Sequence, residues 1–443
     1  MKKNYLIHIL SLAIILFAFA ACSDDDDTVL SKMKDKDFKE FCKQFDTNKD
    51  GVLSRNEALA VTEIRIPLNM SIKSLEGIEQ FENLSILNIT LPEINIIDLS
   101  KNTSLERAII FADRLAEINL EGLTNLNELY IYSSKMDGCN LSECVNLEHL
   151  TLQCTRIENI DLYRLTKLVS LTCSDMPLAS LYISSQKNLK SLSISNSIIK
   201  QLDLSNNTNL IELNCQNCSF ESIDISMLPN LEYLNFTNNA LKELDLSANP
   251  RIKRLTLSQL IHLADVDISH LTNLEYLDIS SNPQLNIDLT FFKKLKVLRS
   301  QSNQLTKLDI TMFEDLAELV LDHNELTELD LSKSNNIKNI SIRHNKIENL
   351  KISQQADLLS LECSNNPINS LDLTSYPNLY YLSSHQTELK ELDLSNNKKL
   401  NWLDCMGNSD LKEILVWKGF FDRPENPDET FIIDYHTQFV EKK

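Results

Sequence analysis

Glycine is scarce in this chain, with six residues among 443. Glycine is the usual residue where a turn needs left-handed backbone angles, because it has no side chain that would clash there. A chain of this length with so few glycines must therefore build its turns from other residues.

Positively charged residues are also scarce. The chain has 43 lysines and arginines against 63 aspartates and glutamates, and its formal net charge is −20. Binding to the phosphates of nucleic acid needs a basic stripe, and the sequence contains none. The composition therefore argues against nucleic acid as a partner and agrees with an exported, soluble body.

Catalytic sequence motifs are missing as well. The chain has no G-x-S-x-G segment, no H-E-x-x-H segment and no phosphate-binding loop. Pairs of carboxylates are so frequent in a chain this acidic that they are no sign of glycosidase chemistry. The sequence therefore predicts a protein that is not an enzyme.

Long apolar runs are limited to the N-terminus, where two lysines precede "YLIHILSLAIILFAFAAC". A basic start followed by an apolar stretch too short to cross a bilayer is typical of a secretory signal. No other segment is long and apolar enough to span a membrane. We therefore expect residues 1–21 to be a cleaved signal peptide.

A repeat of 21 residues fills most of the remaining sequence. Leucine or isoleucine returns at this interval, with one extra residue between Ile252 and Leu274. The anchors of the repeat are Leu84, Leu105, Leu126, Leu147, Leu168, Leu189, Leu210, Leu231, Ile252, Leu274, Leu295, Leu316, Ile337, Leu358, Leu379 and Leu400. Such regularity indicates a solenoid.

The copy "LAELVLDHNELTELDLSKSNN", Leu316 to Asn336, shows the pattern of one coil. With the anchor as position 1, apolar residues occupy positions 1, 4, 6, 11, 14 and 16. Each half alternates apolar and polar residues, which is the signature of a strand with one buried face, and neither half has room for a helix of ten residues. We predict a mainly β solenoid of about 16 coils, each with two short strands and two turns.

Asparagine recurs at position 9 and is the expected substitute for the missing glycines. Asparagine tolerates left-handed backbone angles, and stacked side-chain amides can bond to the carbonyl groups of turns. The asparagines at this position are Asn239, Asn282, Asn303, Asn324, Asn345, Asn366 and Asn408.

The ten cysteines do not form a disulfide scaffold once they are placed on the repeat. Those at position 6, an inward strand site, are Cys173, Cys215, Cys363 and Cys405. The nearest members of this set are two coils apart, roughly 10 Å, which exceeds the Cα separation of a disulfide. We expect buried, unbridged thiols there. A local pair of Cys139 with Cys144 or Cys154 is the minority alternative.

A loop of a different kind, "DTNKDGVLSRNE", lies ahead of the repeats. Its residues match positions 1, 3, 5, 6, 9 and 12 of a calcium-binding EF-hand loop. The expected ligands of Ca2+ are the side chains of Asp46, Asn48, Asp50, Ser54 (through water) and Glu57, together with the backbone carbonyl of Val52.

Only one such loop occurs, whereas calcium sensors carry them in pairs, so sensing is the less favoured role. The preceding segment has Phe38, Phe41, Cys42 and Phe45 on one helical face, and the loop runs without a linker into the first repeat. The end coil of a solenoid leaves its apolar core uncovered and needs a cap. We therefore predict a short helical cap with a structural calcium site.

The outward residues beside the first strand of each coil are the predicted binding surface. Aromatic rings stand there among serine, threonine, asparagine and glutamine, a composition that suits protein binding and is similar to sugar-binding surfaces. The aromatic members are Phe111, Tyr130, Tyr132, Tyr233, Tyr276, Tyr381 and Trp402. The polar members are Arg299, His323, Arg343, His344 and His385. For any single ring, cross-strand packing that stabilises the sheet is the alternative.

His323 and His344 share position 8 in consecutive coils, so they should be near neighbours, with Asp322 and Arg343 close by. A metal or pH-sensitive site is the alternative to a polar binding patch here. The binding patch is favoured because Arg343 lies in the middle of the group.

Aspartate occupies position 15 in seven consecutive coils from Asp203 to Asp330, with Asp267 one residue late, and returns at Asp372 and Asp393. Like charges on neighbouring strands cost stability. The favoured interpretation is that each aspartate bonds locally to the backbone of its turn. The alternative is an acidic stripe for a basic partner or for divalent ions.

The repeat resembles the leucine-rich repeat in its short nested form, with an L-x-x-L-x-L-x-x-N half and an L-x-x-L-D-L-S half. The match weakens before Leu168 and at Leu260, which replaces the asparagine of position 9. The layout of the whole chain resembles the leucine-rich-repeat surface lipoproteins of Bacteroidetes and, more loosely, internalins, whose repeats carry an EF-hand-like cap. This resemblance implies a binding protein displayed at the cell surface.

The segment "FAAC", Phe19 to Cys22, resembles the lipobox of bacterial lipoproteins. The resemblance implies diacylation of Cys22 and a chain held at the membrane by its lipid anchor. The acidic run "SDDDD" after this cysteine is similar to the surface-export signal of Bacteroidetes lipoproteins, and a solvated spacer is the alternative. We expect a lipid-anchored protein of the outer membrane, exposed on the cell surface.

The predicted organisation has five parts: a signal peptide at 1–21, a lipidated cysteine with an acidic tether at 22–33, the EF-hand-like cap at 34–61, the solenoid at 62–415 and a C-terminal cap at 416–443. The last part is separate because the period ends after Leu400. Two apolar stretches around "RPENPDE" suggest that it is a β-hairpin.

The leading hypothesis for function is a non-enzymatic, adhesin-like protein that recognises a macromolecule, a protein in preference to a glycan. The alternative is a surface glycan-binding lipoprotein of a nutrient-uptake system. The sequence names neither the ligand nor the oligomeric state, for which a monomer is the default.

Overall fold

The computed structural model describes residues 28–154, 156–422 and 428–443. The predicted signal peptide, Cys22 and the acidic run after it lie outside these residues. The chain divides into two compact units, one ending at Arg156 and one spanning Ile157–Lys443, and each is described by itself. Among the described residues, none of the helices has the length and apolar character that a membrane span requires.

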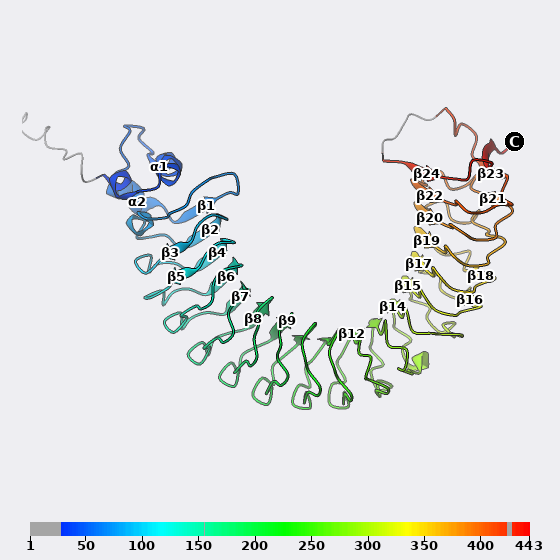
Figure 1. Cartoon of the computed structure of the whole chain (residues 1–443), viewed down its shortest axis with the longest axis horizontal. Coiled ribbons are helices and arrows are strands. Elements are labelled where there is room, and N and C mark those ends of the chain that lie inside the picture. Colours follow the sequence, from blue (N-terminus) through cyan, green and yellow to red (C-terminus); the bar gives the residue numbers. More distant parts are fainter. Residues whose placement is uncertain (1–27, 155, 423–427) are drawn as a thin grey trace, which may run out of the picture. The chain divides into compact units, whose positions relative to one another are not determined.

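The first unit begins with short helices. These are η1 (Val29–Lys32), α1 (Lys36–Cys42), η2 (Lys43–Phe45) and α2 (Arg55–Ala60). Helix α1 starts where the Asp35 carboxylate accepts the backbone N–H groups of Asp37 and Phe38 at 2.9 and 3.0 Å. Helix α2 starts at a reciprocal capping box between Ser54 and Glu57. Both helices lie at the end of the strand stack, beyond β1 (Figure 1).

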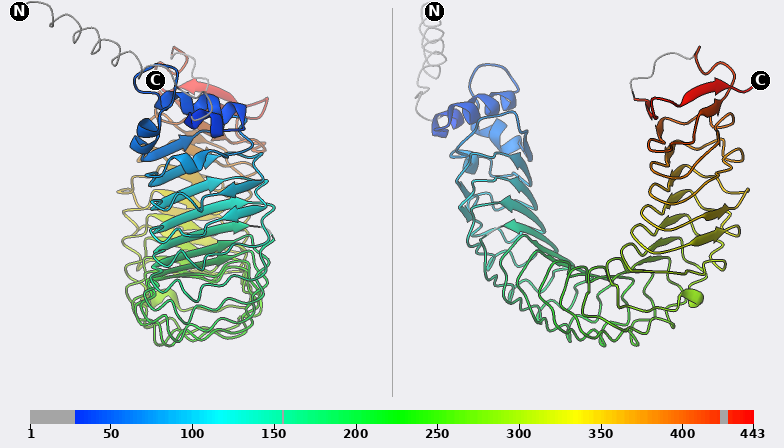
Figure 2. Two further views of the ribbon diagram at one scale, coloured as in Figure 1. Left: turned by 90° about the vertical axis from the view of Figure 1, so that its left-hand side faces the viewer. Right: turned by 45° about the vertical axis from the view of Figure 1, so that its right-hand side comes forward.

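The strands of the first unit stack in chain order and pair in parallel. One sheet contains β1 (Glu63–Ile66), β2 (Ile86–Thr90), β4 (Arg107–Phe111), β6 (Glu128–Ser133) and β7 (His149–Cys154). On the other side of the coils, β3 (Ile96–Asp98) pairs with β5 (Glu117–Asn119), and η3 (Ile78–Gln80) forms one short turn. Figure 2 shows this parallel stack with the helices at its end.

The second unit repeats the same arrangement over more coils. Its main parallel sheet contains β8 (Ser170–Ser174), β9 (Ser191–Ser195), β10 (Glu212–Asn214), β11 (Tyr233–Asn235), β12 (Arg254–Thr256), β13 (Tyr276–Asp278), β14 (Val297–Arg299), β15 (Glu318–Val320), β17 (Asn339–Ser341), β19 (Ser360–Glu362), β20 (Tyr381–Ser383), β22 (Trp402–Asp404) and β24 (Thr430–Ile432). We call the side of the coils that bears this sheet the strand face.

The opposite side of the coils, called the second face, has fewer strands. In the second unit it carries β16 (Glu328–Leu331) paired with β18 (Asn349–Ile352), and β21 (Leu392–Asp393), β23 (Glu413–Val416) and β25 (Gln438–Glu441) in a three-stranded sheet. One short helix, η4 (Leu289–Phe291), also lies there. The expectation of two strands in every coil is therefore met only in part, because most second halves are extended without pairing.

The core is a stack of aliphatic side chains. In the coil that starts at Leu316, all six apolar positions are at most 1% exposed. Burying one such leucine stabilises the fold by about 2 kcal/mol, and each coil covers the apolar side chains of the next. The mainly β, parallel solenoid with a 21-residue period is confirmed.

The number of coils is slightly larger than the 16 expected, since the main sheets contain eighteen strands within the described residues. The additional strands are β1 and β24. Register places Glu63 beside Ile86 and Trp402 beside Thr430, spacings of 23 and 28 residues. These terminal coils are longer than the period, so counting in steps of 21 does not find them.

The predicted C-terminal hairpin is wrong. Strand β24 pairs in parallel with β22, and β25 pairs in parallel with β23. The end of the chain therefore forms one more coil, on which the rings of Phe420, Phe431 and Phe439 pack at centroid distances of 5.1–5.9 Å. The segment 423–427 between its halves lies outside the described residues.

The asparagines of position 9 are buried and join consecutive coils. Asn324 donates from Nδ2 to the carbonyl oxygens of Ser300 and Leu321, and its Oδ1 accepts the N–H groups of Asn303 and Leu305, at 2.8–3.0 Å. Asn239, Asn345 and Asn366 bond to turn carbonyls in the same way. The predicted bonding role of this position is confirmed.

The left-handed backbone angles occur one residue earlier than expected, at position 8. The residues there with φ between 50° and 59° are Asp175, Asn196, Asn217, Asn238, Gln259, Ser281, Ser302, His323, His344, Asn365 and Gln386. Position 9 needs a specific side chain for its hydrogen bonds, whereas position 8 needs only tolerance of a positive φ. Gly407 stands at position 8 with φ 79°.

A second row of buried amides, which the sequence analysis missed, lies at position 19. Asn207 donates to the carbonyl oxygens of Ile183 and Gln186, and Asn249 to those of Ile225 and Leu228. Asn102, Gln186 and Asn397 repeat this pattern. The signal was weak because the residue type at this position varies among the other coils.

The extra residue between Ile252 and Leu274 is absorbed in a turn. Strands β12 and β13 keep their register, with Arg254 beside Tyr276. Downstream, the N–H of Leu263 donates to the carbonyl of Leu260 at 2.8 Å and closes the enlarged turn. The strand face is therefore continuous across the irregular spacing.

The cysteines of position 6 are buried, as expected. Cys215, Cys363 and Cys405 are free thiols, and burial raises the pKa of the last two to about 12. Cys144 is also a free thiol, so the alternative of a bridge to Cys139 is not formed. The side chain of Cys154 lies outside the described residues.

Candidate functional site

The loop of the cap, residues 46–57, begins after η2, ends in the first turn of α2 and folds around its own polar side chains. The N–H of Gly51 donates to Asp46 Oδ2 at 2.8 Å, and the N–H groups of Asp50 and Val52 donate to Asn48 Oδ1 and Asp50 Oδ1, both at 2.8 Å. Two residues, Lys49 and Gly51, have positive φ. The side chains at loop positions 1, 3 and 5 are thereby gathered on the inside of one tight turn.

Glu57 approaches this turn from α2. Its Oε1 accepts the N–H groups of Thr47 and Asn48 at 2.9 and 3.2 Å, and its Oε2 accepts the N–H and hydroxyl of Ser54 at 3.0 and 2.8 Å. Hydrogen bonds from Ser54 and Thr47 lower the pKa of Glu57 to about 2. Position 12 of the loop is therefore an ionised carboxylate fixed against the residues of positions 2, 3 and 9.

The donor set fits a hard cation such as Ca2+. The Oδ1 atom of Asp46 is buried and has no hydrogen-bond partner among the described residues, so its lone pairs are free for a ligand. The side chains of Asn48 and Asp50, two and four residues after Asp46, contribute further oxygen atoms to this set of possible ligands. Within the described part of the chain, however, no three acidic, histidine or cysteine side chains converge on one point, and both oxygens of Glu57 accept hydrogen bonds from the loop.

The cap contacts the first coils through several side chains. Phe38 and Cys42 are fully buried, and the ring of Phe45 meets that of Phe81 edge to face at 5.6 Å. The Asp35 carboxylate also accepts the N–H of Lys73 at 2.8 Å. The N–H of Val29 donates to the carbonyl of Leu53 in the loop at 3.3 Å. The loop is thus also held by the segment that precedes α1.

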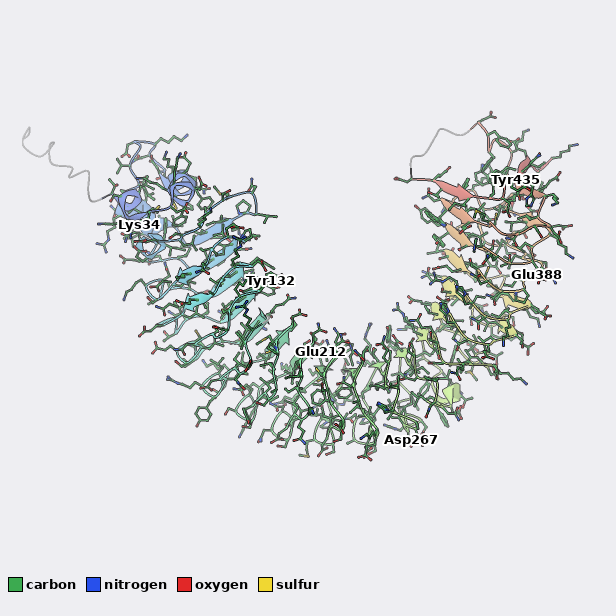
Figure 3. The ribbon with its side chains drawn as sticks, in the orientation of Figure 1. Lys34, Tyr132, Glu212, Asp267, Glu388 and Tyr435 are labelled. Atoms are coloured by element: carbon green, nitrogen blue, oxygen red, sulfur yellow. The ribbon has the colours of Figure 1, made fainter. Side chains whose placement is uncertain are left out.

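The strand face places the predicted binding residues in rows, because parallel strands put equal positions side by side. In the second unit, Tyr276, Glu318, Tyr381 and Trp402 belong to the row of position 3. Figure 3 shows Glu212, from the same row, pointing out of the strand face, while Asp267 points out of the second face.

In the first unit, the three predicted aromatic residues form one cluster. The ring of Phe111 lies 4.8 Å from that of Tyr130 and 6.4 Å from that of Tyr132, centroid to centroid. Phe111 is 38% exposed. These rings therefore pack on one another across the strands while part of their surface stays exposed to a ligand.

In the second unit, the predicted aromatic residues do not form one cluster. Tyr381 and Trp402 stack at 5.7 Å with their ring planes 6° apart. Tyr276 lies between two arginines, with the guanidinium carbons of Arg254 and Arg299 at 4.6 and 5.9 Å from its ring centroid. Tyr233 is next to Arg254 in the row.

Arg299 and Arg343 are held by carboxylates. Arg299 donates to Glu318 Oε1 from Nε at 3.0 Å and from Nη2 at 2.6 Å. Arg343 donates to the buried Asp322 at 3.0 and 2.8 Å and also pairs with Glu362 at 3.1 Å. The hydrogen bond to Asp322 raises the pKa of Arg343, and burial raises the pKa of Glu362. Both arginines are thus neutralised within the chain.

His323 and His344 are neighbours, as predicted, with their rings stacked at 4.3 Å. Desolvation, followed by the charges of His323 and Arg343, lowers the pKa of His344. Both residues occupy the left-handed turn position. His385 lies farther along, with Nδ1 3.8 Å from Asp404. No metal-binding group of three side chains occurs here or elsewhere in the described residues.

The aspartates of position 15 bond locally, as favoured from the sequence. Each accepts the backbone N–H of the residue two positions later, at 2.9–3.1 Å; the acceptors are Asp203, Asp224, Asp245, Asp267, Asp288, Asp309, Asp330, Asp372 and Asp393. A hydrogen bond from the side chain of Ser226, together with the backbone bond, lowers the pKa of Asp224. The backbone bond, together with the side chain of Thr311, lowers the pKa of Asp309. The repeated D-L-S segment is therefore a turn element.

Sequence reasoning missed the charged partners on the strand face. Arg254, Glu318 and Glu362 take part in the contacts of the predicted residues, yet they had no aromatic or histidine character to single them out. Arranging the repeats in register would have shown that Arg254 falls between two tyrosines.

Comparison with solved structures shows similar folds. An internalin, InlF from Listeria monocytogenes, is 22% identical with a TM-score of 0.55 over 72% of this chain and 92% of that chain. The LRR protein LIC12759 from Leptospira interrogans is 21% identical, with a TM-score of 0.53 over 86% of this chain and 97% of that chain.

A third similar structure comes from a plant. The LRR ectodomain of the membrane receptor kinase GASSHO1/SCHENGEN3 from Arabidopsis thaliana, in complex with CASPARIAN STRIP INTEGRITY FACTOR 2, is 20% identical, with a TM-score of 0.54 over 81% of this chain and 56% of that chain. No protein-family model and no curated protein matches the chain.

Proposed function

Because the chain has the leucine-rich-repeat fold, we propose that it is a non-enzymatic binding protein whose strand face recognises a macromolecule, a protein in preference to a glycan. The observation that carries this proposal is the strand face itself. Partly exposed aromatic and charged side chains stand there in register over consecutive coils. Residues of these types dominate the binding energy of protein interfaces. The plant ectodomain of the same fold is in complex with a named factor, which agrees with this proposal.

The proposal includes a structural Ca2+ ion in the cap. Asp46, Asn48, Asp50, Ser54 and Glu57, with the carbonyl of Val52, would hold it, and the ion would neutralise the carboxylates that the loop gathers. The unpartnered oxygen of Asp46 supports the assignment. Because η2 and α2 flank the loop and contact the first coils, a bound ion would fix the cap to the solenoid.

The proposal also places the protein at the outer membrane, tethered by lipid on Cys22 and exposed on the cell surface. Support for this part comes from the sequence of residues 1–27, which resembles a lipoprotein leader. Mass spectrometry of Cys22 in the native host tests the lipid, and protease accessibility of intact cells tests the exposure.

The experiment that tests binding is a capture assay with immobilised residues 28–443, once with calcium and once with chelator. Extracellular-matrix proteins, bacterial surface proteins and a glycan panel are passed over both. Capture of a protein under both conditions supports the proposal, with calcium confined to the cap. Capture that needs calcium shows that the loop is coupled to the strand face. Failure to retain any protein contradicts the proposal.

A glycan-binding lipoprotein of a nutrient-uptake system is the second candidate. The observation in its favour is the stacked pair of Tyr381 and Trp402, with Glu362 on the strand beside that of Tyr381 and Asp404 on the strand of Trp402 itself. Retention of glycans without protein, lost on Trp402→Ala, would give this candidate precedence. Changes of Tyr130 or Tyr132 test the first unit in the same way.

Calcium binding yields a separate prediction. We expect Asp46→Asn to weaken Ca2+ affinity at least tenfold, since the loss of one charged ligand removes a large part of the attraction in such a loop. Titration calorimetry measures the affinity, and Asp37→Asn, an exposed aspartate of α1, is the matched control. Equal affinities in the two variants would show that the loop is not the calcium site.

A further inference from the structure

Arg254 differs from the other strand-face arginines of the second unit. Arg299 is bonded to Glu318, and Arg343 to Asp322 and Glu362. The guanidinium group of Arg254 makes no hydrogen bond or ion pair within the part of the chain that the structure describes, and the residue is exposed. All five of its N–H donors are therefore available to a ligand.

Arg254 stands between two tyrosines in the row, and its guanidinium group rests on the ring of one of them. Arg254 on β12 has Tyr233 beside it on β11 and Tyr276 beside it on β13. Its guanidinium carbon lies 4.6 Å from the ring centroid of Tyr276. A guanidinium group on an aromatic face is held by cation–π attraction while its N–H groups remain directed outward. The side chain thus has little conformational freedom to lose on binding.

Carboxylates near this row already have partners. The carboxylates of Glu232 and Glu275 form ion pairs with the amino groups of Lys253 and Lys296, both at 2.8 Å. The carboxylate of Glu318 forms an ion pair with Arg299. An uncompensated positive charge on the strand face is unusual in a chain with a net charge of −20. Because these carboxylates are engaged elsewhere, the guanidinium group of Arg254 is left to water or to a ligand.

We propose that the row of Tyr233, Arg254 and Tyr276 binds the carboxylate side chain of an aspartate or glutamate in a protein partner. This proposal rests on the binding function proposed above. The guanidinium group would take both carboxylate oxygens, and the tyrosine rings would cover the neighbouring apolar part of the partner. The overall negative charge of this chain repels a strongly acidic protein. The partner segment is therefore one isolated acid in a neutral or basic surrounding.

The test uses random twelve-residue peptides displayed on phage and selected on immobilised residues 28–443. Selected peptides are synthesised, and their affinities are measured by fluorescence polarisation for the wild type, Arg254→Ala, Arg254→Lys and Arg251→Ala. Arg251 is the matched control: it is exposed, carries the same charge three residues earlier, and its guanidinium group bonds to Asn230 rather than facing the row.

We expect the selected peptides to share a single aspartate or glutamate. Arg254→Ala should weaken their binding at least tenfold, Arg254→Lys should restore only part of the loss because lysine lacks the two-pronged geometry, and Arg251→Ala should change it less than twofold. Replacing the acid of the peptide by its amide should cause a similar loss, and combining both changes should add little to either.

Four outcomes overturn the proposal. Selected peptides without a shared acid, or binding that Arg254→Ala leaves unchanged, would remove the role of Arg254 while leaving the binding function in place. Selection of no peptide would also end it, and the capture assay then decides separately on the binding function. Binding of chondroitin sulfate that depends on Arg254, without peptide binding, would assign the site to an anionic glycan.

Discussion

At the scale of single residues, this protein depends on side-chain amides that bond between coils. Each position-9 asparagine satisfies backbone groups of its own coil and of its neighbours. Without them, buried carbonyl and N–H groups in the turns would have no partner, which is expensive in a nonpolar surrounding. The scarcity of glycine is therefore offset by asparagine for hydrogen bonding and by tolerant residues for positive φ.

Asn324→Ala tests this role. The substitution leaves at least two buried backbone groups without partners, and we expect the free energy of unfolding to fall by about 2–4 kcal/mol. Asn336→Ala, whose exposed amide bonds to Glu314, is the control and should cost less than about 1 kcal/mol. Urea unfolding followed by circular dichroism measures both. Similar losses in the two variants would show that burial of the amide is unimportant.

Much of this residue-level architecture could be predicted from the sequence, because the repeat multiplies weak signals. The bonding of position 9, the local bonds of the position-15 aspartates and the buried cysteines each recur in several coils. The left-handed position was assigned one residue late because residue type alone does not separate tolerance of positive φ from a need for an amide. Arg254 was missed because its meaning depends on its neighbours on adjacent strands.

At the scale of elements, the helical cap covers the end coil of the first unit. Its attachment depends on Asp35, whose carboxylate accepts N–H groups of Asp37 and Phe38 in α1 and of Lys73 in the solenoid. Burial alone would raise the pKa of Asp35, but these backbone hydrogen bonds together lower it below its ordinary value of 3.8. One side chain therefore both starts a helix and links it to the coils.

We expect Asp35→Ala to loosen the cap by about 1–3 kcal/mol, the sum of a lost helix cap and a lost bond to Lys73. Because the folded pKa is lowered, the contribution of the carboxylate is complete above pH 3.8 and disappears as the pH falls through the folded value. Native-state hydrogen exchange of the α1 amides measures the effect. Asp37→Ala should change protection little, and a loss of protection spread evenly over the solenoid would contradict a role confined to the cap.

The terminal elements also mark the limit of prediction from a period. Strands β1 and β24 continue the sheets, but the long spacings before β2 and after β22 conceal them. The segments that join β1 to β2 and β22 to β24 are longer than one repeat. Their lengths depend on local packing at the two ends rather than on the repeat. An apolar stretch on either side of a polar segment is compatible with a hairpin and with a parallel coil alike, so the C-terminal hairpin was a reasonable but wrong choice.

At the scale of the whole molecule, stability comes from stacking and not from cross-links in the described residues. Cys215, Cys363 and Cys405 are free thiols inside the stack. Their raised pKa values, about 12 for the last two, keep the reactive thiolate form rare at neutral pH. Oxidising surroundings should therefore leave these three buried thiols unchanged in the folded protein.

We expect a reducing agent to leave the thermal unfolding midpoint unchanged, because no disulfide of the core would be lost. A thiol reagent at pH 8 should label these cysteines no faster than the chain unfolds, while urea should make all of them reactive within minutes. Calorimetry with and without dithiothreitol, and mass spectrometry of labelled peptides, check the two statements. A lower midpoint on reduction would reveal a structural bridge.

The enlarged turn after Leu260 has a consequence for how such a surface can evolve. One residue was accommodated there without disturbing the pairing of β12 with β13. Genes with tandem repeats gain and lose whole units by unequal recombination, and each additional unit would lengthen the strand face by about 4.8 Å, one strand spacing. Small errors in the length of a unit are buffered by the turns. The reach of the recognition surface can therefore change in steps while the rows that already contact a ligand keep their chemistry.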